Sequence, residues 1–394
     1  MKLNIAVFFG GESCEHEISC ITGNQALKAI DSDKYEITPI YVAKNSDLYT
    51  GEKLFELKNY YDLNTLCNSL DKICLYKDNN KTYFKPIKGM FAKAKQIDIA
   101  FLAMHGTNGE DGVLQGMLEM LDLPYTSSNV LGSALGQDKA VMKQVLACEN
   151  IPMVPWFCVY SCDIEDKIKE YEKLADEIGY PLIVKPANLG SSIGIEVVHV
   201  QSELYAKLKE ARNYDDKIVV EKMITKLKEV NISVMGRTDN IRLSAIEEVF
   251  KNDELLSFKD KYESNNGSKK CGGKLKAPSS GSKGMASTSR IVPARLKEDQ
   301  ENEIRDYASR SFKALSAKGV VRIDFMIDEE TDKVYVNEIN SIPGSLAFYL
   351  WKEVGVDFKE ECNLLIENAL TAYRNKKKKT RTFDTNILSN YKEN

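Results

Sequence analysis

The segment from residue 320 to residue 340 constrains the fold of this 394-residue chain more than any other stretch. Polar and apolar residues alternate along both of its halves. This pattern is typical of β-strands, because successive side chains point to opposite faces. A turn near residues 328–333 would join the two halves into a hairpin with an apolar back. The residues of that back are Ile323, Phe325 and Ile339.

The polar front of this hairpin has an unusual composition. Arg322 and Asp324 share it on the first strand, and Glu338 and Asn340 share it on the second. With the expected turn, Asp324 falls opposite Glu338, and Arg322 falls opposite Asn340. Two carboxylates and an amide oxygen form a hard-oxygen ligand set that suits Mg²⁺ carrying nucleotide phosphates. A salt-bridged surface hairpin is the alternative interpretation of the same residues.

A second candidate element combines lysines with a Gly-Ser-Ser turn. A strand expected at 181–185 would deliver Lys185 to a pocket, and the turn at 190–192 follows closely. Backbone N–H groups and hydroxyls of such a turn suit phosphate oxygens. Lys139, at the start of a predicted helix, is another candidate phosphate ligand. A plain hairpin loop and a surface lysine are the alternatives, but the lysine just before the turn favours nucleotide binding.

The first ~125 residues alternate between predicted strands and helices, which is typical of a parallel sheet covered by helices. A polar loop at 10–17 follows the expected strand 4–9, and another at 105–112 follows the strand 97–103. Ligands of parallel sheets bind at this end of the strands, so we expect the two loops to converge. Glu15 could hold a substrate ammonium group there, or it could simply complement a helix dipole.

The chain is longer than a single core usually organises, so two or three domains are expected. A segment rich in Lys, Ser and Gly interrupts the last of them. We interpret its first part as a lid or substrate-lining loop, with disorder as the alternative, and we expect plain disorder for 264–288. The expected divisions are an N-terminal α/β substrate-binding domain (1–127), a central subdomain (128–224), a C-terminal subdomain (225–374) with the long loop 251–290, and a polar basic tail (375–394).

The composition excludes several classes of function. The net charge of −4 gives no footprint for nucleic acid, and no apolar stretch approaches the ~18 residues of a membrane span. Three histidines argue against His-dependent hydrolases, and neither GxxxxGK[ST] nor GxGxxG occurs. The nine cysteines form no CxxC pair, so we expect reduced, mostly buried thiols in a cytoplasmic protein.

Eight segments in chain order closely resemble the D-alanine–D-alanine ligase family, over nearly the whole chain to about residue 374. They are GGESCEHEIS (10–19), HGTNGEDGVLQGMLE (105–119), DKAVMK (138–143), PLIVKPANLGSSIG (181–194), VVEKM (219–223), KY (261–262), RIDF (322–325) and NEINSIPG (337–344). The resemblance implies an ATP-grasp fold preceded by an N-terminal parallel α/β domain. It also implies a homodimer that joins two D-alanines for peptidoglycan synthesis, with ATP held between the second and third domains.

The resemblance further implies roles for individual residues. Two Mg²⁺ ions, with Mn²⁺ as an alternative, would be bound by Asp324, Glu338 and Asn340. The nucleotide would be held by Lys139, Lys185, Ser192, Glu221, Lys222, Glu229 and Lys261. The catalytic set would be Glu15, Ser191, Arg322, Gly344 and Tyr262.

Within that catalytic set, Glu15 would grip the ammonium group of the first D-amino acid and would join Ser191 and Tyr262 in tying down the lid. Arg322 and the Gly344 N–H would stabilise the tetrahedral oxyanion. His105 and Lys261 would lie near the second substrate.

The acceptor end departs from the family pattern. After Pro343-Gly344 the family usually has Phe or Met, then Thr, and a few residues later a serine that contacts the second substrate's carboxylate. Here Tyr349 stands where that serine is expected, and a family PYTG segment reads PYTSS. Tyr262 favours a dipeptide over a D-lactate ester. A ligase for another acceptor, such as D-serine, and an ATP-binding paralogue that does not ligate remain alternatives.

Overall fold

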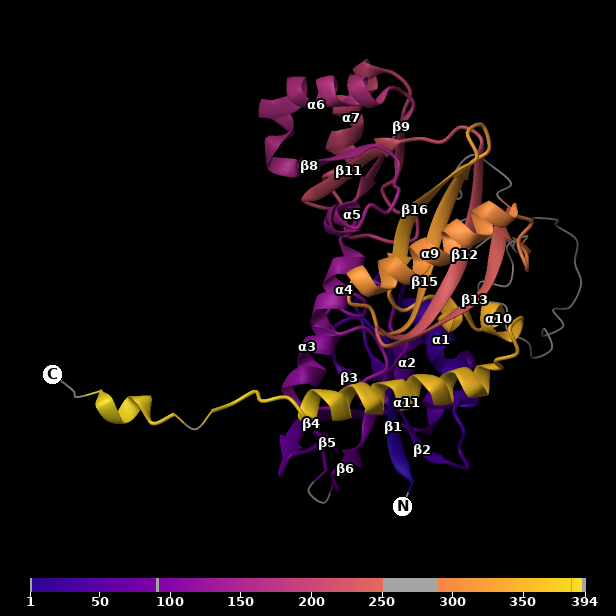
Figure 1. Cartoon of the computed structure of the whole chain (residues 1–394). Helices are drawn as coiled ribbons and strands as arrows, with labels where there is room; N and C mark the ends of the chain where they lie inside the picture. Colours follow the sequence, from indigo (N-terminus) through magenta and orange to yellow (C-terminus); the bar gives the residue numbers. More distant parts are fainter. Residues whose placement is uncertain (1, 90–91, 251–289, 384, 392–394) are drawn as a thin grey trace, which may run out of the picture.

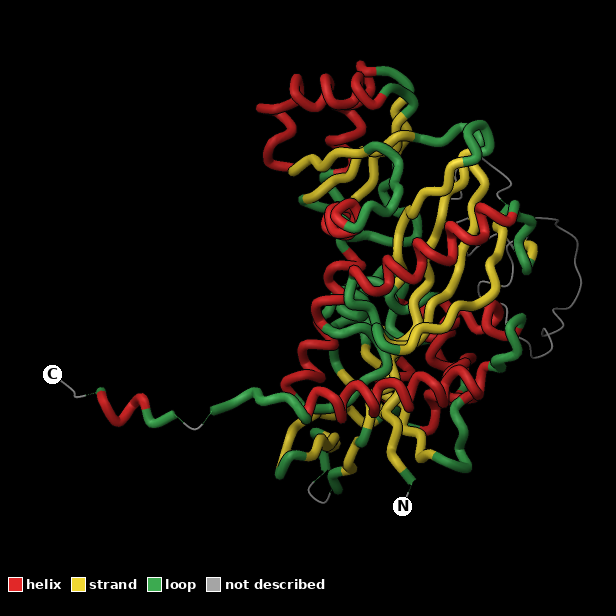
Figure 2. Tube along the Cα trace, viewed as in Figure 1, coloured by secondary structure: helices red, strands yellow, loops and turns green. Residues whose placement is uncertain are grey.

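The computed structural model describes residues 2–89, 92–250, 290–383 and 385–391. These residues form three β-sheets, each with its own helices. Figure 1 shows the N-terminal sheet at the bottom of the view and the four-stranded central sheet at the top, with the five-stranded sheet between them on the right. Figure 2 shows helices on the outside of all three sheets. The predicted lid loop 251–290, apart from Arg290, lies outside the described residues.

The N-terminal sheet has seven strands in the order β6-β5-β4-β3-β2-β1-β7. The parallel part expected from the sequence is β1 with its neighbours on both sides, and four further strands extend it in antiparallel pairs. The tight turn between β4 and β5 is too short for the crossover that parallel strands need, so these two strands form a hairpin. The strands are β1 (Leu3–Gly10), β2 (Tyr35–Val42), β3 (Leu48–Thr50), β4 (Asp71–Asp78), β5 (Lys81–Pro86), β6 (Lys95–Ile97) and β7 (Ile99–Leu102).

The helices around this sheet include three from the C-terminal part of the chain, α11 (Phe358–Lys377), η5 (Gly344–Ala347) and α10 (Phe348–Lys352). Helix α11 lies across the N-terminal unit in Figure 1. Its Leu365 and Ile366 pack in one hydrophobic core with Ile5 and Phe101 of the sheet. The C-terminal helix therefore completes the N-terminal core. The remaining helices here are α1 (His16–Ala29), η1 (Glu52–Phe55), η2 (Leu57–Tyr61), α2 (Leu63–Asn68) and α3 (Val113–Met120).

The central sheet is antiparallel in the order β10-β9-β11-β8, and two helices cover one of its faces (Figure 1). Helix α5 begins at Lys139, after Asp138 accepts hydrogen bonds from the backbone N–H groups of Ala140 and Val141. The elements are α4 (Val130–Gln137), α5 (Lys139–Cys148), β8 (Trp156–Tyr160), η3 (Ser161–Asp163), α6 (Ile164–Ile178), β9 (Leu182–Pro186), β10 (Glu196–Val198), α7 (Gln201–Ala211) and β11 (Lys217–Lys222).

The third sheet is antiparallel in the order β14-β13-β12-β15-β16. Helix α9 covers one face through Ile304, Ala308 and Phe312. The predicted hairpin register is confirmed, because Asp324 pairs with Glu338 and Arg322 pairs with Asn340. The elements are β12 (Leu227–Arg237), β13 (Asn240–Val249), β14 (Arg290–Ile291), α9 (Glu298–Ala314), β15 (Gly319–Asp328) and β16 (Lys333–Asn340), with η6 (Ile387–Asn390) in the tail.

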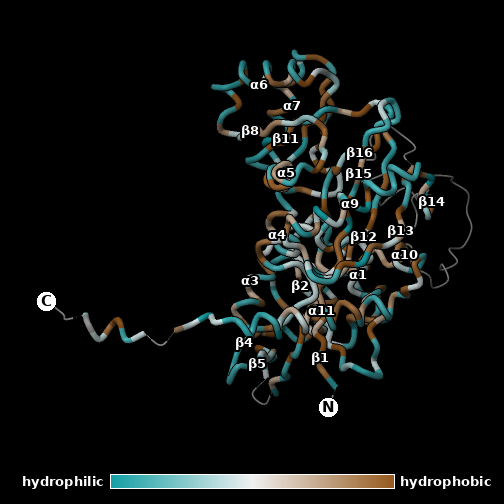
Figure 3. The backbone as a smooth tube through the Cα atoms, in the orientation of Figure 1, coloured by the Kyte–Doolittle hydropathy of each residue, from teal (hydrophilic) through white to brown (hydrophobic). Residues whose placement is uncertain are grey.

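Hydropathy agrees with this layering, since the tube in Figure 3 is brown along β1, where seven of eight residues are buried. No helix of the described residues is long and apolar enough to cross a membrane. The expectation of mostly buried thiols is wrong. Of the eight cysteines in the described part, only Cys20 and Cys362 are buried, while four that lie in loops, at a helix end or on an edge hairpin are exposed.

Candidate active site

The candidate site lies where loops of the N-terminal sheet and the central sheet meet the polar front of β15 and β16. The Ser191 hydroxyl, in the turn after β9, donates a short hydrogen bond to Glu15 Oε1 at the start of α1. The loop after β7 lies against the same carboxylate, since a Cβ on Gly106 would come within 3.1 Å of Glu15 Oε2. The two N-terminal loops therefore converge, as the sequence predicts.

A buried cluster of two lysines and one glutamate joins the central sheet to α5. Glu221 lies between them, with Oε1 2.5 Å from Lys185 Nζ and Oε2 3.0 Å from Lys143 Nζ. Burial alone would raise the pKa of Glu221, but the two ammonium groups outweigh it and hold the pKa below its usual range. Sequence analysis missed Lys143, although it follows Lys139 by four residues and therefore lies on the same face of the helix.

Lys139 links this cluster to the hairpin. Its ammonium donates to the Leu189 carbonyl at 2.7 Å and lies 3.4 Å from Glu338 Oε2. The Gly-Ser-Ser turn follows Leu189 directly, and both serines have left-handed backbones, with φ of 54° at Ser191 and 59° at Ser192. Lys139 therefore lies between the loop that carries this turn and the front of the hairpin.

On the hairpin front, Arg322 binds both oxygens of Asp324, with Nε to Oδ1 at 2.6 Å and Nη2 to Oδ2 at 2.7 Å. Asn340 Nδ2 donates to the same Oδ2 at 3.2 Å. Burial disfavours the charge on Arg322, but Asp324 outweighs it and raises the arginine pKa, so the guanidinium stays protonated.

The donor set fits a divalent cation. Asp324 and Glu338 face each other across the two strands, with the Asn340 amide beside them. Two carboxylates and an amide offer oxygen ligands only, the set that Mg²⁺ prefers. The described residues contain no group of three or more His, Cys, Asp or Glu that could hold a metal ion. The amide oxygen of Asn340 would be the third protein ligand on the hairpin, beside the two carboxylates.

Tyr349, which stands where the family serine is expected, is held in a polar cluster. Its hydroxyl donates to Glu247 Oε1 at 2.9 Å, and its ring lies 4.2 Å from the Arg290 guanidinium carbon. Arg290 Nη1 also donates to Glu247 Oε2 at 3.1 Å. Burial, together with the negative charge of Glu247, raises the pKa of Tyr349. The phenol therefore stays neutral and fixed in place. It lies close enough to Arg322 for the two groups to interact electrostatically.

Other expected residues are placed differently. The Lys222 ammonium donates to the carbonyls of Gly179 at 3.0 Å and Tyr180 at 2.9 Å, so it turns toward the end of α6 and away from Glu221. Glu229 lies half-buried on β12, between β13 and β15. Lys261 and Tyr262 lie outside the described residues.

His105 is buried, and both of its ring nitrogens contact protein atoms. Nδ1 lies 2.8 Å from the Ile342 carbonyl oxygen, and Nε2 lies 2.7 Å from Thr22 Oγ1. Gly344 follows two residues later and begins a turn in which three non-glycine residues have left-handed backbones, with φ of 52° at Ser345, 54° at Leu346 and 57° at Ala347. His105 thus contacts the loop that carries Gly344.

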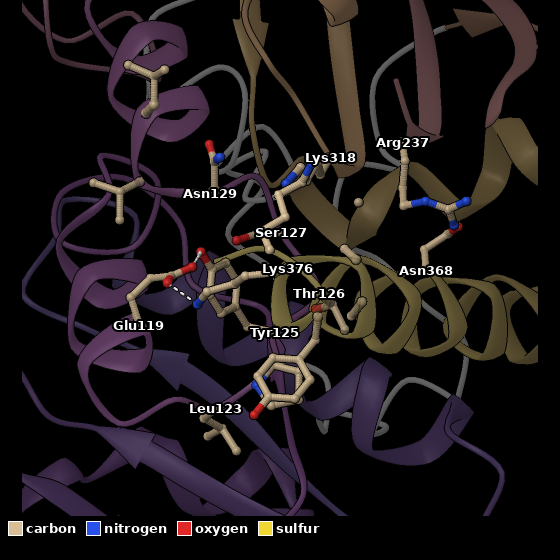
Figure 4. Close-up of a pocket in the computed structure, with 18 of the residues that line it drawn as sticks. Glu119, Leu123, Tyr125, Thr126, Ser127, Asn129, Arg237, Lys318, Asn368 and Lys376 are labelled. Atoms are coloured by element: carbon tan, nitrogen blue, oxygen red, sulfur yellow. Dashed lines mark hydrogen bonds and ion pairs between the residues drawn. The ribbon is translucent and has the colours of Figure 1, made fainter. Parts of the chain in front are cut away.

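A separate cavity of about 630 Å³ lies between α11, α4 and the start of β15 (Figure 4). Figure 4 shows Lys376 of α11 reaching Glu119 of α3, and Arg237 next to Asn368. None of the residues that line it belongs to the site expected from the sequence.

Both halves of the chain match families of known proteins. Residues 4–128 match the family described as D-ala D-ala ligase N-terminus, and residues 145–282 and 280–367 match D-ala D-ala ligase C-terminus. A D-alanine--D-alanine ligase of Thermosipho melanesiensis is 39% identical over 387 residues, which is 98% of each chain. The D-alanine--D-alanine ligase of Bacillus pumilus is 32% identical and covers 97% of this chain.

Two solved structures resemble the chain over most of its length. The D-alanine-D-alanine ligase from Coxiella burnetii superposes with a TM-score of 0.78 at 28% identity, covering 96% of both chains. The VanG D-Ala:D-Ser ligase from Enterococcus faecalis superposes with a TM-score of 0.75 at 26% identity, covering 94% of this chain and 100% of that one.

Proposed function

The chain belongs to the D-alanine–D-alanine ligase family, and from this premise we propose that it uses ATP to join two D-alanine molecules for peptidoglycan synthesis in the cytoplasm. The observation that carries the proposal is the 39% identity to a D-alanine--D-alanine ligase over 98% of both chains. The hairpin front supports it independently, because Asp324 and Glu338 lie opposite each other beside a charged arginine.

Lys139 and Lys185 would bind the triphosphate, with Lys143 and Glu221 fixing the second of them. The contacts of Lys139 with the Leu189 carbonyl and Glu338 support this role, because they put its charge between the Gly-Ser-Ser turn and the hairpin. Asp324, Glu338 and Asn340 would hold Mg²⁺. The ions would neutralise phosphate charge and polarise the transferred phosphoryl group.

The first D-alanine would bind with its ammonium group at Glu15, at the end of β1 and the start of α1. Its carboxylate attacks the terminal phosphorus of ATP, ADP leaves, and an acyl phosphate forms. The amine of the second D-alanine then attacks the acyl carbonyl, so negative charge develops on the carbonyl oxygen until inorganic phosphate leaves and the amine has lost a proton. Arg322 and the Gly344 N–H would stabilise this oxyanion. The raised pKa of Arg322, caused by Asp324 against the effect of burial, supports this role.

Water must be excluded while the acyl phosphate exists, because it would otherwise hydrolyse. The hydrogen bond from Ser191 to Glu15 supports a closure role for this pair, since it joins the central unit directly to the N-terminal unit. Tyr262 would complete the closure in the family pattern.

An acceptor other than D-alanine is the second candidate, and Tyr349 favours it. The tyrosine replaces the serine expected at the acceptor carboxylate, and it is fixed by Glu247 and Arg290. The resemblance to a D-Ala:D-Ser ligase structure makes D-serine the first alternative to test.

A second copy of the chain would be its protein partner. Exposed apolar side chains gather on two consecutive helices, which supports a homodimer because such side chains favour burial. They are Val113, Met117 and Met120 on α3, spaced along one helix face, and Val130 and Leu131 on α4.

The test is a phosphate-release assay with purified protein, ATP, Mg²⁺ and a panel of D- and L-amino acids. Release with D-alanine alone, accompanied by D-alanyl-D-alanine, is the expected result. Release only with D-alanine plus a partner amino acid would favour the second candidate. An absence of release in every pairing, with ATP still bound, would refute both ligase functions and leave an ATP-binding paralogue.

A further inference from the structure

The loop that carries Gly344 is held by the N-terminal unit at two backbone positions. Before the glycine, the Ile342 N–H donates to Glu110 Oε1 at 2.8 Å. After it, the Ser345 N–H donates to the Thr22 hydroxyl oxygen at 3.0 Å. Both acceptors are buried, and both belong to elements around the N-terminal sheet. The backbone N–H of Gly344 therefore lies between two anchors that come from another part of the chain.

His105 joins the Thr22 anchor to the backbone of the loop at Ile342. The Ile342 carbonyl can only accept, so His105 Nδ1 carries the proton and donates to it at 2.8 Å. Burial lowers the pKa of His105 and favours the neutral ring, so Nε2 accepts from the Thr22 hydroxyl at 2.7 Å. The Thr22 oxygen in turn accepts from the Ser345 N–H. Each of these groups can donate or accept in only one way here. The chain of hydrogen bonds therefore fixes the tautomer of His105 and the position of the loop together.

Glu110 anchors a second backbone segment at the same time. Its Oε2 accepts from the Gly106 N–H at 2.8 Å, while Oε1 accepts from Ile342. Burial, with the nearby charge of Glu15, raises the pKa of Glu110 to about 8. One carboxylate thus joins the loop after β7, which positions His105, to the loop before Gly344.

The conformation of the held loop explains why anchors are needed. Ser345, Leu346 and Ala347 all have left-handed backbones, which residues with a Cβ adopt only at a cost. Such a strained segment persists only when surrounding contacts over-determine it. Leu346 and Ala347 are buried, and the Ser345 N–H is bound to Thr22. Without the anchors, the turn would relax and the Gly344 N–H would move.

We propose that Thr22, His105 and Glu110 are positioning residues that hold the Gly344 N–H where the oxyanion forms during acyl transfer. The inference rests on the proposed function. It gives His105 a role through the backbone instead of direct contact with the second substrate, and it assigns roles to Thr22 and Glu110, which sequence analysis did not single out. Formation of the acyl phosphate does not use this oxyanion, so the three residues should affect the second step selectively.

The experiment compares the two steps in single turnover, with ADP formation reporting phosphorylation of D-alanine and dipeptide formation reporting acyl transfer. At pH 9, above the raised pKa of Glu110, the glutamate is a carboxylate that accepts from both N–H donors. The Glu110→Gln side chain keeps the size of glutamate but offers these two donors one acceptor oxygen and one NH₂ group. We expect dipeptide formation to slow about 10- to 100-fold, since a misplacement of ~1 Å costs roughly 100-fold. ADP formation should stay within about threefold of wild type.

A second pair of variants keeps the inference testable if Glu110→Gln does not fold. Thr22→Val removes the hydroxyl at nearly constant volume and should slow the second step selectively, while Thr22→Ser should restore it. Thr82→Val is the matched control, because Thr82 is also buried in the N-terminal unit, on β5, and its hydroxyl donates to the Leu121 carbonyl at 2.7 Å. That control should lower the melting temperature without separating the two steps.

The outcomes separate the inference from the function beneath it. If wild type forms dipeptide and folded Glu110→Gln or Thr22→Val slows both steps alike, or neither, the positioning role is overturned. If wild type forms no dipeptide with any amino acid, the proposed function fails and the inference fails with it.

Discussion

Arg322 and Asp324, two residues apart on β15, form a two-pronged ion pair in which each oxygen of the carboxylate accepts from a different guanidinium nitrogen, at 2.6 and 2.7 Å. The pair links the group proposed for oxyanion stabilisation to a proposed metal ligand. A change to one of them should therefore disturb both parts of the site.

Arg322→Lys should lower kcat by about 100-fold or more, at saturating ATP and D-alanine. Lysine keeps the charge but cannot make two parallel hydrogen bonds, and loss of one oxyanion donor typically costs 10²–10³-fold. Arg305→Lys, in a partly buried ion pair on α9, is the matched control and should retain full activity. A kcat for Arg322→Lys within threefold of wild type would contradict the assigned role.

Glu338→Gln should abolish turnover by weakening cation binding, since an amide replaces one of two carboxylates in the oxygen set. The activity should be measured across a Mg²⁺ titration, in which the variant requires much higher Mg²⁺ or does not respond. Asp332→Asn, in the turn of the same hairpin, removes an exposed carboxylate and serves as control. Near-normal rates at ordinary Mg²⁺ would refute the metal assignment.

Lys143→Met should destabilise the fold by about 3 kcal/mol at pH 7, because breaking a buried ion pair leaves a poorly compensated charge. The pKa of Glu221 is lowered in the folded state by its two lysines, against the effect of burial. The charged Glu221 side chain therefore stabilises the fold fully at pH values above the pKa of an unfolded glutamate. This stabilisation is lost as the pH falls through the lower pKa that Glu221 has in the folded protein.

Urea unfolding at a series of pH values checks this prediction. The difference in unfolding free energy between wild type and Lys143→Met should shrink as the pH falls below about 4, when Glu221 becomes protonated. A difference that is small at pH 7, or constant down to pH 3, would show that the cluster does not contribute in this way.

Tyr349→Phe should raise the KM of the second amino acid by about tenfold and leave single-turnover ADP formation unchanged. Loss of the hydroxyl removes one of the two hydrogen bonds to Glu247 Oε1, leaving the one from Asn231, and loosens the ring that stacks on Arg290. A shift in KM without a change in kcat indicates lost binding of the acceptor alone. If Tyr349→Phe has the same KM as wild type for both D-alanine and D-serine, Tyr349 does not contribute to binding of the second amino acid.

Met120→Lys should convert a homodimer to monomers, since it puts a charge in the exposed apolar surface of α3 and α4. Light scattering after gel filtration measures the mass directly. Lys173→Met, an exposed change on α6, is a control for altered surface charge. A wild-type protein that is monomeric at micromolar concentration would refute the homodimer.

The hairpin at 320–340 could be predicted in register because its alternation is local and its turn is short. The four antiparallel strands between Leu48 and Ile97 could not, since β3 and β6 have only three residues each and β4 has a single buried residue. Lys143 could have been predicted from the sequence, because it follows Lys139 by four residues and residues with this spacing share a helix face. Thr22 and Glu110 were not, because their partners at Ser345 and Ile342 lie more than 200 residues away along the chain.

The packing of α11 against the N-terminal sheet has a consequence for synthesis of the protein. Domains generally fold in order as they emerge from the ribosome. Here Leu365 and Ile366 fill the same core as Ile5 and Phe101, so the first sheet lacks part of its interior until almost the whole chain has been translated. The nascent N-terminal unit therefore exposes apolar surface until α11 has been made, longer than its place at the start of the chain would suggest.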